Sequence, residues 1–318
     1  GGTDADYVAG ATHLTGGQGN DTLTVGAGSQ TIDGGDGNDE IFAGDDIDYL
    51  YGGAGNDILR GEAGNDWMYG GDDNDTLDGG AGNDTVTLSS VTEDDTVTGG
   101  EGTDILVLGT GTTYTAEDSA GSGISGFEVI AAGSASLVQN MSGLGENSIA
   151  TLAVAGGTSG TIQEGAISTV LATGSATAVL GLATDFAADA LTVSVGHSAT
   201  GSGAKSLALS AQDYEALTIS STGADGNSVT LGTTEAGYLA TTAAELAAQE
   251  AAAAARTASD LTSITVVGNK NLTVTTSAED TALATVNAST FTGEELTVVA
   301  SSSDAAMTVT AAGAYKAT

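Results

Sequence analysis

A nine-residue period runs through the first third of the chain and limits its fold more than any other feature. Eight consecutive units carry glycine mainly at positions one, two and four, aspartate at position six and an apolar residue at position eight. The units begin at Gly16, Val25, Gly34, Ala43, Gly52, Gly61, Gly70 and Gly79. A period of this length predicts a stack of short structural units, in which each unit needs its neighbours to bury a core.

Each position of the unit has a physical role. Glycines in the turn allow positive φ and close approach of the backbone, and asparagine at position five tolerates the left-handed region. The three residues after the aspartate form a short strand, whose middle side chain points inward because side chains alternate along a strand. The inward row is Leu23, Ile32, Ile41, Leu50, Leu59, Met68, Leu77 and Val86. Two units complete one coil, so the turns stack along two edges at about 4.8 Å per coil.

The stacked turns predict calcium as the cofactor. The chain has no cysteine, which excludes thiolate sites and leaves oxygen donors, the ligands of calcium. Calcium takes roughly 6 to 8 oxygens, more than one turn supplies, so a site needs two successive turns of one edge, and we expect about four to seven ions. The candidate metal ligands occupy positions one, three and six: Gly16, Gln18, Asp21, Gly34, Asp36, Asp39, Asp48, Gly52, Ala54, Asp57, Gly61, Ala63, Asp66, Gly70, Asp72, Asp75, Gly79, Ala81, Asp84, Asp95 and Asp104.

The two edges are not equivalent. Edge one is formed by the units that begin at residues 16, 34, 52 and 70, and its aspartates are complete. Edge two is formed by the units at 25, 43, 61 and 79, where Gln30 replaces the first aspartate and Asp46 replaces a glycine. We therefore expect edge one to fill more completely. Asp66 and Asp84 form the best pair on edge two, although Glu62 stands there in place of the second glycine.

The period shifts after residue 87. Asp84 and Asp95 are eleven residues apart, two more than the period, and nine-residue spacing then returns between Asp95 and Asp104. The pattern G-G-x-G-x-D-x-apolar-x over this region resembles the calcium-binding repeats of the RTX family. The resemblance implies a calcium-stabilised parallel β-roll, which we place at residues 1–108.

Beyond residue 108 the chain becomes rich in Thr, Ala, Val and Ser, with β-like segments such as 151–155, 191–195 and 271–276. Their spacing predicts an all-β second domain at 109–318, either a further β-solenoid or a β-sandwich. One Ala-rich stretch differs, because Thr242 and Glu245 form a capping-box pattern ahead of it. We expect a helical insertion near 242–257.

Charge and motifs exclude several functions. With 42 acidic and 5 basic residues and a net charge of -37, the chain cannot neutralise phosphates, so no nucleic-acid partner is expected. No apolar run is long enough to span a membrane. A zinc protease motif is absent, and the GHSAT segment at His197 and Ser198 lacks the last glycine of a nucleophile elbow. We therefore predict no catalytic residue and no enzyme.

Two other features allow more than one interpretation. Glu93, Asp94 and Asp95 could form an acid/base group, but beside the shift of period they fit a structural cap or one extra ion better. Tyr49, Tyr51, Trp67 and Tyr69 occupy solvent-facing strand positions. They are either an exposed contact surface or a surface packed against the next domain.

The RTX units are followed by sequence segments such as GISGFEVI and ATVNASTFTGEELTVV. In this combination the chain resembles bacterial surface-layer proteins of the RTX type. This resemblance implies export by type I secretion, a place on the bacterial cell surface, and self-assembly into a lattice. It also implies a cell-surface polysaccharide partner contacted outside this chain. The alternatives are an adhesin stalk or surface-binding module, and the secretion and folding domain of a larger protein. Because the chain opens inside a motif without a signal peptide, we expect it to be a fragment.

Overall fold

The computed structural model describes residues 5–7, 12–88, 95–109, 123–132, 136–140, 149–154, 159–165, 167, 169–172, 176–182, 190–195, 206–211, 216–221, 227–231, 263–268, 272–275, 285–292, 295–299, 308–311 and 315–317. These residues form strands and turns without a helix, so the predicted all-β class is confirmed. The chain falls into two compact units, Gly1–Ile149 and Ala150–Thr318. The domain division at residue 108 marks the end of the repeat pattern and remains a prediction.

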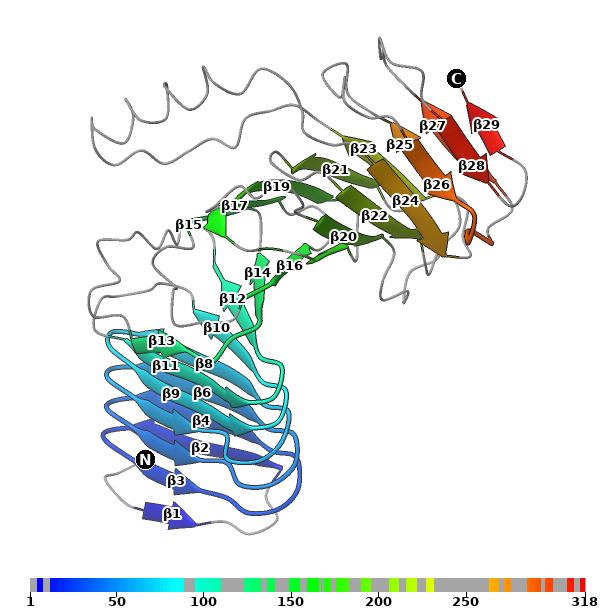
Figure 1. Ribbon diagram of the computed structural model, residues 1–318. Helices are drawn as coiled ribbons and strands as arrows, with labels where there is room; N and C mark the ends of the chain where they lie inside the picture. Colours follow the sequence, from blue (N-terminus) through cyan, green and yellow to red (C-terminus); the bar gives the residue numbers. More distant parts are fainter. Residues whose placement is uncertain are drawn as a thin grey trace, which may run out of the picture. The chain divides into compact units, whose positions relative to one another are not determined.

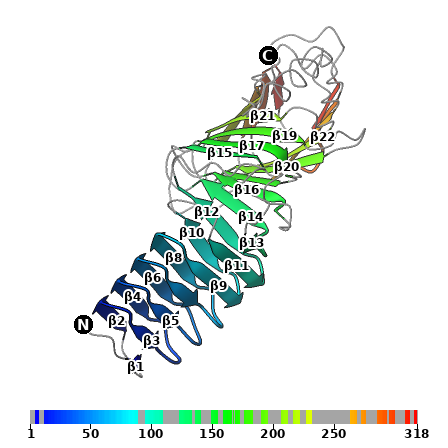
Figure 2. The ribbon, with the colours of Figure 1, turned by 90° about the vertical axis from the view of Figure 1, so that its left-hand side faces the viewer.

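Two parallel sheets build the first unit (Figures 1 and 2). One sheet has the order β1-β3-β5-β7-β9-β11-β13, and the other runs β2-β4-β6-β8-β10-β12-β14. The odd strands are β1 (Ala5–Tyr7), β3 (Thr22–Thr24), β5 (Glu40–Phe42), β7 (Ile58–Arg60), β9 (Thr76–Ala81), β11 (Thr96–Glu101) and β13 (Gly123–Ser125). The even strands are β2 (His13–Gln18), β4 (Thr31–Asp36), β6 (Tyr49–Ala54), β8 (Trp67–Asp72), β10 (Thr85–Leu88), β12 (Ile105–Leu108) and β14 (Val129–Ala132), and β15 (Ser136–Asn140) follows them.

The register between coils follows the repeat length. Thr22 pairs with Glu40, eighteen residues on, whereas Thr85 pairs with Ile105, twenty residues on. The shift of two residues after residue 87 is therefore present in the register. The inserted residues themselves fall in 89–94, outside the described part.

The core consists of the inward-facing apolar side chains at position eight of each repeat unit. All eight predicted side chains are buried, Leu77 at 1% exposure and the other seven at 0%. In-register pairing places these side chains above one another, for example Leu50 on Met68 and Leu59 on Leu77. Each apolar side chain so buried contributes about 1.5 to 3 kcal/mol, which holds the two narrow sheets together.

The glycines divide into two functional types. Most of those at positions two and four have positive φ, as Gly35 (107°) and Gly37 (133°) show. Those at position one do not, and they are needed for space instead. A Cβ on Gly34 would lie 2.5 Å from Asp39 Oδ2 and 2.6 Å from the carbonyl oxygen of Gly52. Asp46, Glu62 and Asp73 take glycine positions at positive φ, a backbone conformation that costs about 1 kcal/mol for a non-glycine residue.

The expected role of asparagine at position five was wrong. None of these asparagines is among the positive-φ residues of the described chain. Instead, the side-chain oxygens of Asn20, Asn38, Asn56, Asn65 and Asn83 accept the backbone N–H of the equivalent residue one coil later. Asn38 N–H donates to Asn20 Oδ1 at 3.0 Å and Asn83 N–H to Asn65 Oδ1 at 2.8 Å. Asparagine is thus selected because it links successive turns.

The even strands of the first unit, together with β9 and β11 of the odd sheet, are longer than the three residues predicted. Strand β4 continues through Gly34 and Gly35 to Asp36, and the glycines of successive coils pair in register, Gly35 with Gly53. The absence of side chains lets the ladder extend into the turn, because backbones can approach closely there.

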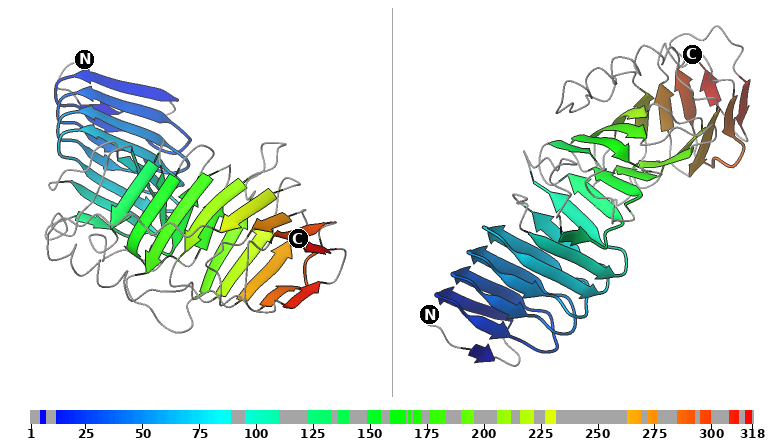
Figure 3. Two further views of the ribbon diagram at one scale, coloured as in Figure 1. Left: turned by 90° about the horizontal axis from the view of Figure 1, so that it is seen from above. Right: turned by 60° about the vertical axis from the view of Figure 1, so that its left-hand side comes forward.

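The second unit is also a stack of parallel strands, seen from above in the left view of Figure 3. Its two ladders are β16-β18-β20-β22-β24-β26-β28 and β17-β19-β21-β23-β25-β27-β29. The bounds are β16 (Thr151–Val154), β17 (Ser159–Gly165), β18 (Thr169–Ala172), β19 (Ala176–Leu182), β20 (Ala190–Val195), β21 (Ser206–Ala211), β22 (Ala216–Ser221), β23 (Asn227–Leu231), β24 (Ser263–Gly268), β25 (Leu272–Thr275), β26 (Thr285–Ala288), β27 (Leu296–Val299), β28 (Thr308–Ala311) and β29 (Tyr315–Ala317).

Parallel pairing decides between the two predicted architectures for this unit. A β-sandwich is built from antiparallel sheets, so the ladders select the β-solenoid. Its core is aliphatic: Leu207, Val229, Val274 and Val298 lie in register, with exposures of 1%, 0%, 0% and 0%. The connection between β23 and β24 contains residues 242–257. The predicted helix, with Thr242 and Glu245, lies outside the described residues.

Candidate metal centre

Two ladders of aspartates run along the edges of the first unit. On edge one, the backbone N–H of Asp21, Asp39, Asp57 and Asp75 each donates to Oδ1 of the aspartate in the next coil, at 2.7, 2.8, 3.0 and 2.9 Å, and the ladder ends at Asp95. On edge two, Gln30, Asp48, Asp66 and Asp84 donate in the same way at 2.6, 2.8, 2.8 and 2.8 Å, and the ladder reaches Asp104. One carboxylate oxygen per turn is therefore used to join coils.

The second oxygen of these side chains is buried without a hydrogen-bond partner. This group comprises Oε1 of Gln30 and Oδ2 of Asp21, Asp39, Asp48, Asp57, Asp66, Asp84 and Asp104. The eight residues are between 0% and 4% exposed. A buried, unsatisfied polar atom costs about 1 to 3 kcal/mol, and more if it is charged. A row of such oxygens fits a bound cation, which would satisfy them.

The position-one glycines show which other oxygens lie beside these carboxylates. A Cβ on Gly16 would be 2.7 Å from Asp21 Oδ2 and 2.7 Å from the carbonyl oxygen of Gly34, one coil later. The same two groups meet at Gly61, where Asp66 Oδ2 and the carbonyl of Gly79 would each lie 2.5 Å from a Cβ. A carboxylate from one turn and a carbonyl from the next thus face the same small space. This donor set, hard oxygens from two successive turns, is of the type that calcium binds.

The residues at position three act through their backbone. The carbonyls of Asp36, Ala54 and Ala81 accept the N–H of the preceding turn's residue at position four, at 2.7, 2.8 and 2.9 Å. The side chains at this position are mostly exposed: Gln18, Asp36, Ala54, Asp72 and Ala81 face solvent and Ala63 is half-buried. A carbonyl keeps a second lone pair after one hydrogen bond. These carbonyls therefore remain possible ligands whatever the side chain is.

Edge two differs from edge one in a way that the sequence reasoning missed. Its first two turns carry Val25 and Ala43 at position one, and both side chains are buried, at 5% and 0% exposure. In the other turns this position must be glycine, because a Cβ would collide with the aspartate oxygen. The signal was present in the sequence as a non-glycine residue at position one. The ligand space beside Gln30 and Asp48 is narrowed by these side chains.

The replacements that the sequence analysis did identify also lie in these turns. Gln30 donates a long hydrogen bond from Nε2 to the carbonyl of Ala27, at 3.4 Å. Asp46 accepts the N–H of Gly28 through Oδ2 at 3.0 Å, so its carboxylate serves the turn itself. Both observations agree with an incomplete metal site at the start of edge two.

Burial dominates the electrostatics of the ladders. Loss of hydration raises the pKa of Asp57 and of Asp66 to about 7, and that of Asp48, Asp75 and Asp84 to about 6. Hydrogen bonds from the backbone oppose this rise, and neighbouring carboxylates such as Asp75 beside Asp57 add to it. The pKa of Asp39 and of Asp104 is also raised, for the same first reason. The charged ladder is therefore unfavourable until a cation offsets it.

Side chains alone do not form a metal cluster. In the part of the chain that the structure describes, no three His, Asp or Glu side chains come close enough to share one ion. A bound ion must then draw most of its ligands from carbonyl groups and water, which suits calcium and not zinc.

Comparison with known proteins agrees with this geometry. The sequence model of the RTX calcium-binding nonapeptide repeat, which spans four copies, matches residues 15–50, 51–86 and 87–113. Residues 15–113 therefore form an RTX array. RTX repeats bind Ca²⁺ and are typical of proteins secreted by the type I route. No curated protein and no solved structure was found to match the chain.

The RTX array accounts for the predicted ligands but not for every residue singled out. His13, which is not a predicted ligand, is exposed on β2, whereas the predicted ligand Asp95 accepts the backbone N–H of Asp75 at the end of the edge-one ladder. His197, Ser198, Glu93 and Asp94 lie outside the described residues. Among the residues that are described, no helix is long and apolar enough to cross a membrane.

The aromatic side chains lie on the outer face of β6 and β8. Tyr49, Tyr51 and Trp67 are 40%, 38% and 41% exposed, and Ile47 in the preceding turn is 45% exposed. The rings stack between coils, with centroids 6.1 Å apart for Tyr49 and Trp67 and 5.0 Å for Tyr51 and Tyr69. We call Ile47, Tyr49, Tyr51, Trp67 and Tyr69 the aromatic strip.

Proposed function

We propose that this chain is a secreted structural protein, without catalytic activity, whose first unit folds when calcium fills the two aspartate ladders. The observation that carries the proposal is the row of buried, unpartnered oxygens along both edges. Without a cation, these groups must be either charged and unsatisfied or protonated. Calcium removes that penalty, so its binding free energy becomes folding free energy.

The calcium requirement supports a function outside the cell. Metal-dependent domains are unfolded without metal and folded with it, and extracellular modules bind calcium with dissociation constants of about 10⁻⁴ to 10⁻³ M. A chain with these affinities stays unfolded where calcium is scarce and folds where it is abundant. This behaviour fits type I secretion followed by folding at the bacterial cell surface.

We further propose that the folded chain associates with copies of itself into a surface layer. The net charge of -37 keeps metal-free chains apart by repulsion. Binding of about four to seven calcium ions adds 8 to 14 positive charges and leaves about -29 to -23. The aromatic strip then offers a rigid apolar contact surface.

The aromatic strip also favours a second candidate function, that of an adhesin module. Exposed Tyr and Trp rings combine an apolar surface with a polar group, which suits contact with a polysaccharide. In that case the chain remains a monomer in calcium and binds a glycan.

A calcium titration of the full chain tests the proposal. Light scattering should rise over the same calcium range in which circular dichroism shows the array folding, and electron microscopy should show ordered sheets. A variant with Tyr49→Thr and Trp67→Thr should fold normally but assemble less. Thr98→Ser, on the opposite sheet, is the matched control. A chain that folds in calcium, stays monomeric and binds a glycan supports the adhesin, and a chain whose fold ignores calcium contradicts both.

A further inference from the structure

Edge two continues for one turn beyond the RTX array. The last repeat turn, at residues 99–104, is followed on this edge by a short turn at residues 126–128, which leads into β14. The new turn lies outside residues 15–113, which the repeat family matches. It spans three residues from its glycine to its acid, whereas a repeat turn spans six. No repeat pattern identifies it.

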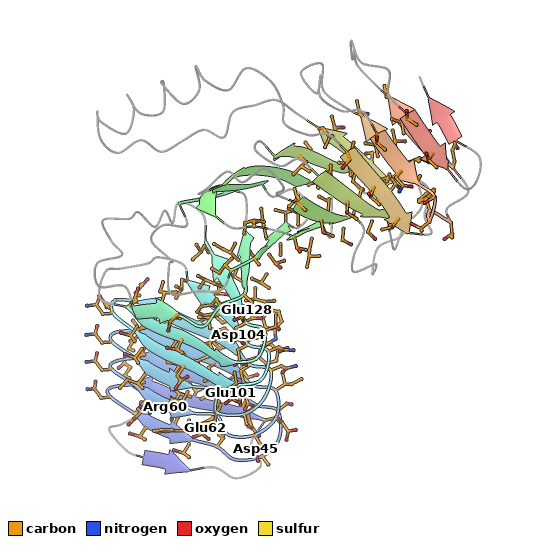
Figure 4. All side chains as sticks on the ribbon, in the orientation of Figure 1. Asp45, Arg60, Glu62, Glu101, Asp104 and Glu128 are labelled. Carbon is orange, nitrogen blue, oxygen red and sulfur yellow. The ribbon has the colours of Figure 1, made fainter. Side chains whose placement is uncertain are left out.

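Glu128 stands where the next aspartate of the ladder would be. Its Oε2 accepts the backbone N–H of Asp104 at 2.9 Å, just as Asp104 Oδ1 accepts that of Asp84 at 2.8 Å. The register agrees, because Ile105 pairs with Val129 and each residue directly follows its acid. Figure 4 labels Asp104 and Glu128 next to each other at the end of the edge. The extra methylene of glutamate gives the longer reach that a shorter turn requires.

Gly126 stands where the next position-one glycine would be. A Cβ on Gly99 would collide with the carbonyl oxygen of Gly126 and lie 2.8 Å from Asp104 Oδ2. In the repeats, Gly16 has the same relation to Gly34 and Asp21. Unlike the position-one glycines of the repeats, Gly126 has a positive φ of 75°, in the left-handed region that glycine adopts easily. The short turn thus reaches the same carbonyl position beside Gly99 with a different backbone conformation.

Asp104 provides an independent sign of a ligand. Its side chain is 0% exposed, and its Oδ2 is buried with no hydrogen-bond partner. This oxygen faces the space that Gly99 leaves open, next to the carbonyl of Gly126. Glu128 brings a second carboxylate to the same pair of turns. Two carboxylates and a carbonyl are hard donors that calcium accepts, with water or further carbonyls completing its shell.

We propose that a calcium ion binds between the 99–104 turn and the 126–128 turn, held by Asp104 Oδ2, the carbonyl of Gly126 and the carboxylate of Glu128. The proposal rests on calcium binding by the RTX array and adds one ion beyond it. This ion fastens the non-repeat strand β14 to the end of the array. Calcium binding then also stabilises residues that lie outside the repeat array.

Substitution of Glu128 in the full chain tests the site. Glu128→Gln keeps an oxygen that can accept the Asp104 N–H but removes the charge. Equilibrium dialysis with calcium should show one ion fewer per chain, while the calcium midpoint for array folding, followed by circular dichroism, stays within about twofold. Asp78→Asn is the matched control, because Asp78 is exposed on β9 and lies outside both turns of the proposed site, and it should lose no ion. An unchanged stoichiometry and affinity in Glu128→Gln overturns the proposal.

A crystal structure of the wild-type chain grown in calcium provides the second measurement. An ion should lie about 2.3 to 2.6 Å from Asp104 Oδ2 and from the carbonyl oxygen of Gly126. If calcium fills the repeat sites but no ion lies between these two oxygens, the further site is overturned and the function of the array is not. Calcium absent from every turn overturns the function of the array itself. This structure decides the question even if Glu128→Gln does not fold.

Discussion

Replacing Asp57 by asparagine should stabilise the metal-free array and destabilise the calcium-bound one. Asp57 is 1% exposed, and burial raises its pKa from 3.8 to about 7. Above pH 7 the folded state therefore holds a charge that burial disfavours, at a cost of at most about 4 kcal/mol. Asparagine removes this cost. Its Oδ1 still accepts the N–H of Asp39, a bond of 2.8 Å in the wild type.

The amide group of asparagine also has a partner in place. Asp57 Oδ2 and the carbonyl of Gly70 both adjoin the Cβ position of Gly52, so an amide N–H placed there can donate to that carbonyl. In calcium the substitution should lower stability instead of raising it, because Asp57 belongs to two successive pairs of turns, one with Asp39 and one with Asp75. Loss of its charge should weaken calcium binding at least about tenfold, or 1.4 kcal/mol.

Urea unfolding at pH 8, followed by circular dichroism, measures both effects. In excess chelator, Asp57→Asn should unfold at a higher urea concentration than the wild type, and in calcium at a lower one. Asp78→Asn is the matched control, because it removes the same charge from an exposed position on β9 and should shift neither curve by more than about 0.5 kcal/mol. If Asp57→Asn is less stable than the wild type in chelator too, the buried charge does not oppose folding and the electrostatic reasoning is refuted.

Three further predictions follow from the ladders. The pKa values of the buried aspartates in the folded state lie above the unfolded value of 3.8, so the metal-free array should gain stability as pH falls from about 7 to about 4. Calcium affinity, measured by titration calorimetry, should fall over the same pH range because protons compete with calcium for the carboxylates. Gly34→Ala should lower calcium stoichiometry and thermal stability, whereas Gly109→Ala, in the segment after β12, should change stability by less than about 1 kcal/mol. Equal effects of the two substitutions would contradict the argument that glycine at position one leaves space for the ligands. Asp57→Ala should reduce calcium stoichiometry by more than Asp48→Ala, and equal losses would show that the two edges are equivalent.

The nine-residue period was enough to predict the coil, its inward row and its ladders. Leu50 and Met68 are eighteen residues apart and stack in register, because two nine-residue units return the chain to the same edge. The same arithmetic predicted that the aspartates align in two rows and that the register changes after residue 87. These features depend on sequence spacing alone, since the strand alternation fixes which side chains face inward.

The tertiary structure decided what the recurring glycine at position one and asparagine at position five of the repeat are for. Glycine at position one proved to be a matter of space and not of φ, because its Cβ would meet both the aspartate of its own turn and a carbonyl of the next coil, as Asp39 and Gly52 do for Gly34. Asparagine at position five proved to be a link between coils. Neither reason is fully visible within one unit, since each involves a contact between residues eighteen apart that exists only once the coils are stacked.

The same dependence on contacts between coils explains which residues of the candidate site could not be found from the sequence. Val25 and Ala43 narrow the start of edge two because their side chains occupy space that glycine leaves open elsewhere. Glu128 and Gly126 extend the other end although no period reaches them. Sequence spacing determines ligands only while the nine-residue unit can be recognised, as it still can at Asp95 and Asp104 after the shift. Where the unit is lost, as between Asp104 and Glu128, only the hydrogen bonds and register of the folded chain decide which residue comes next on the ladder.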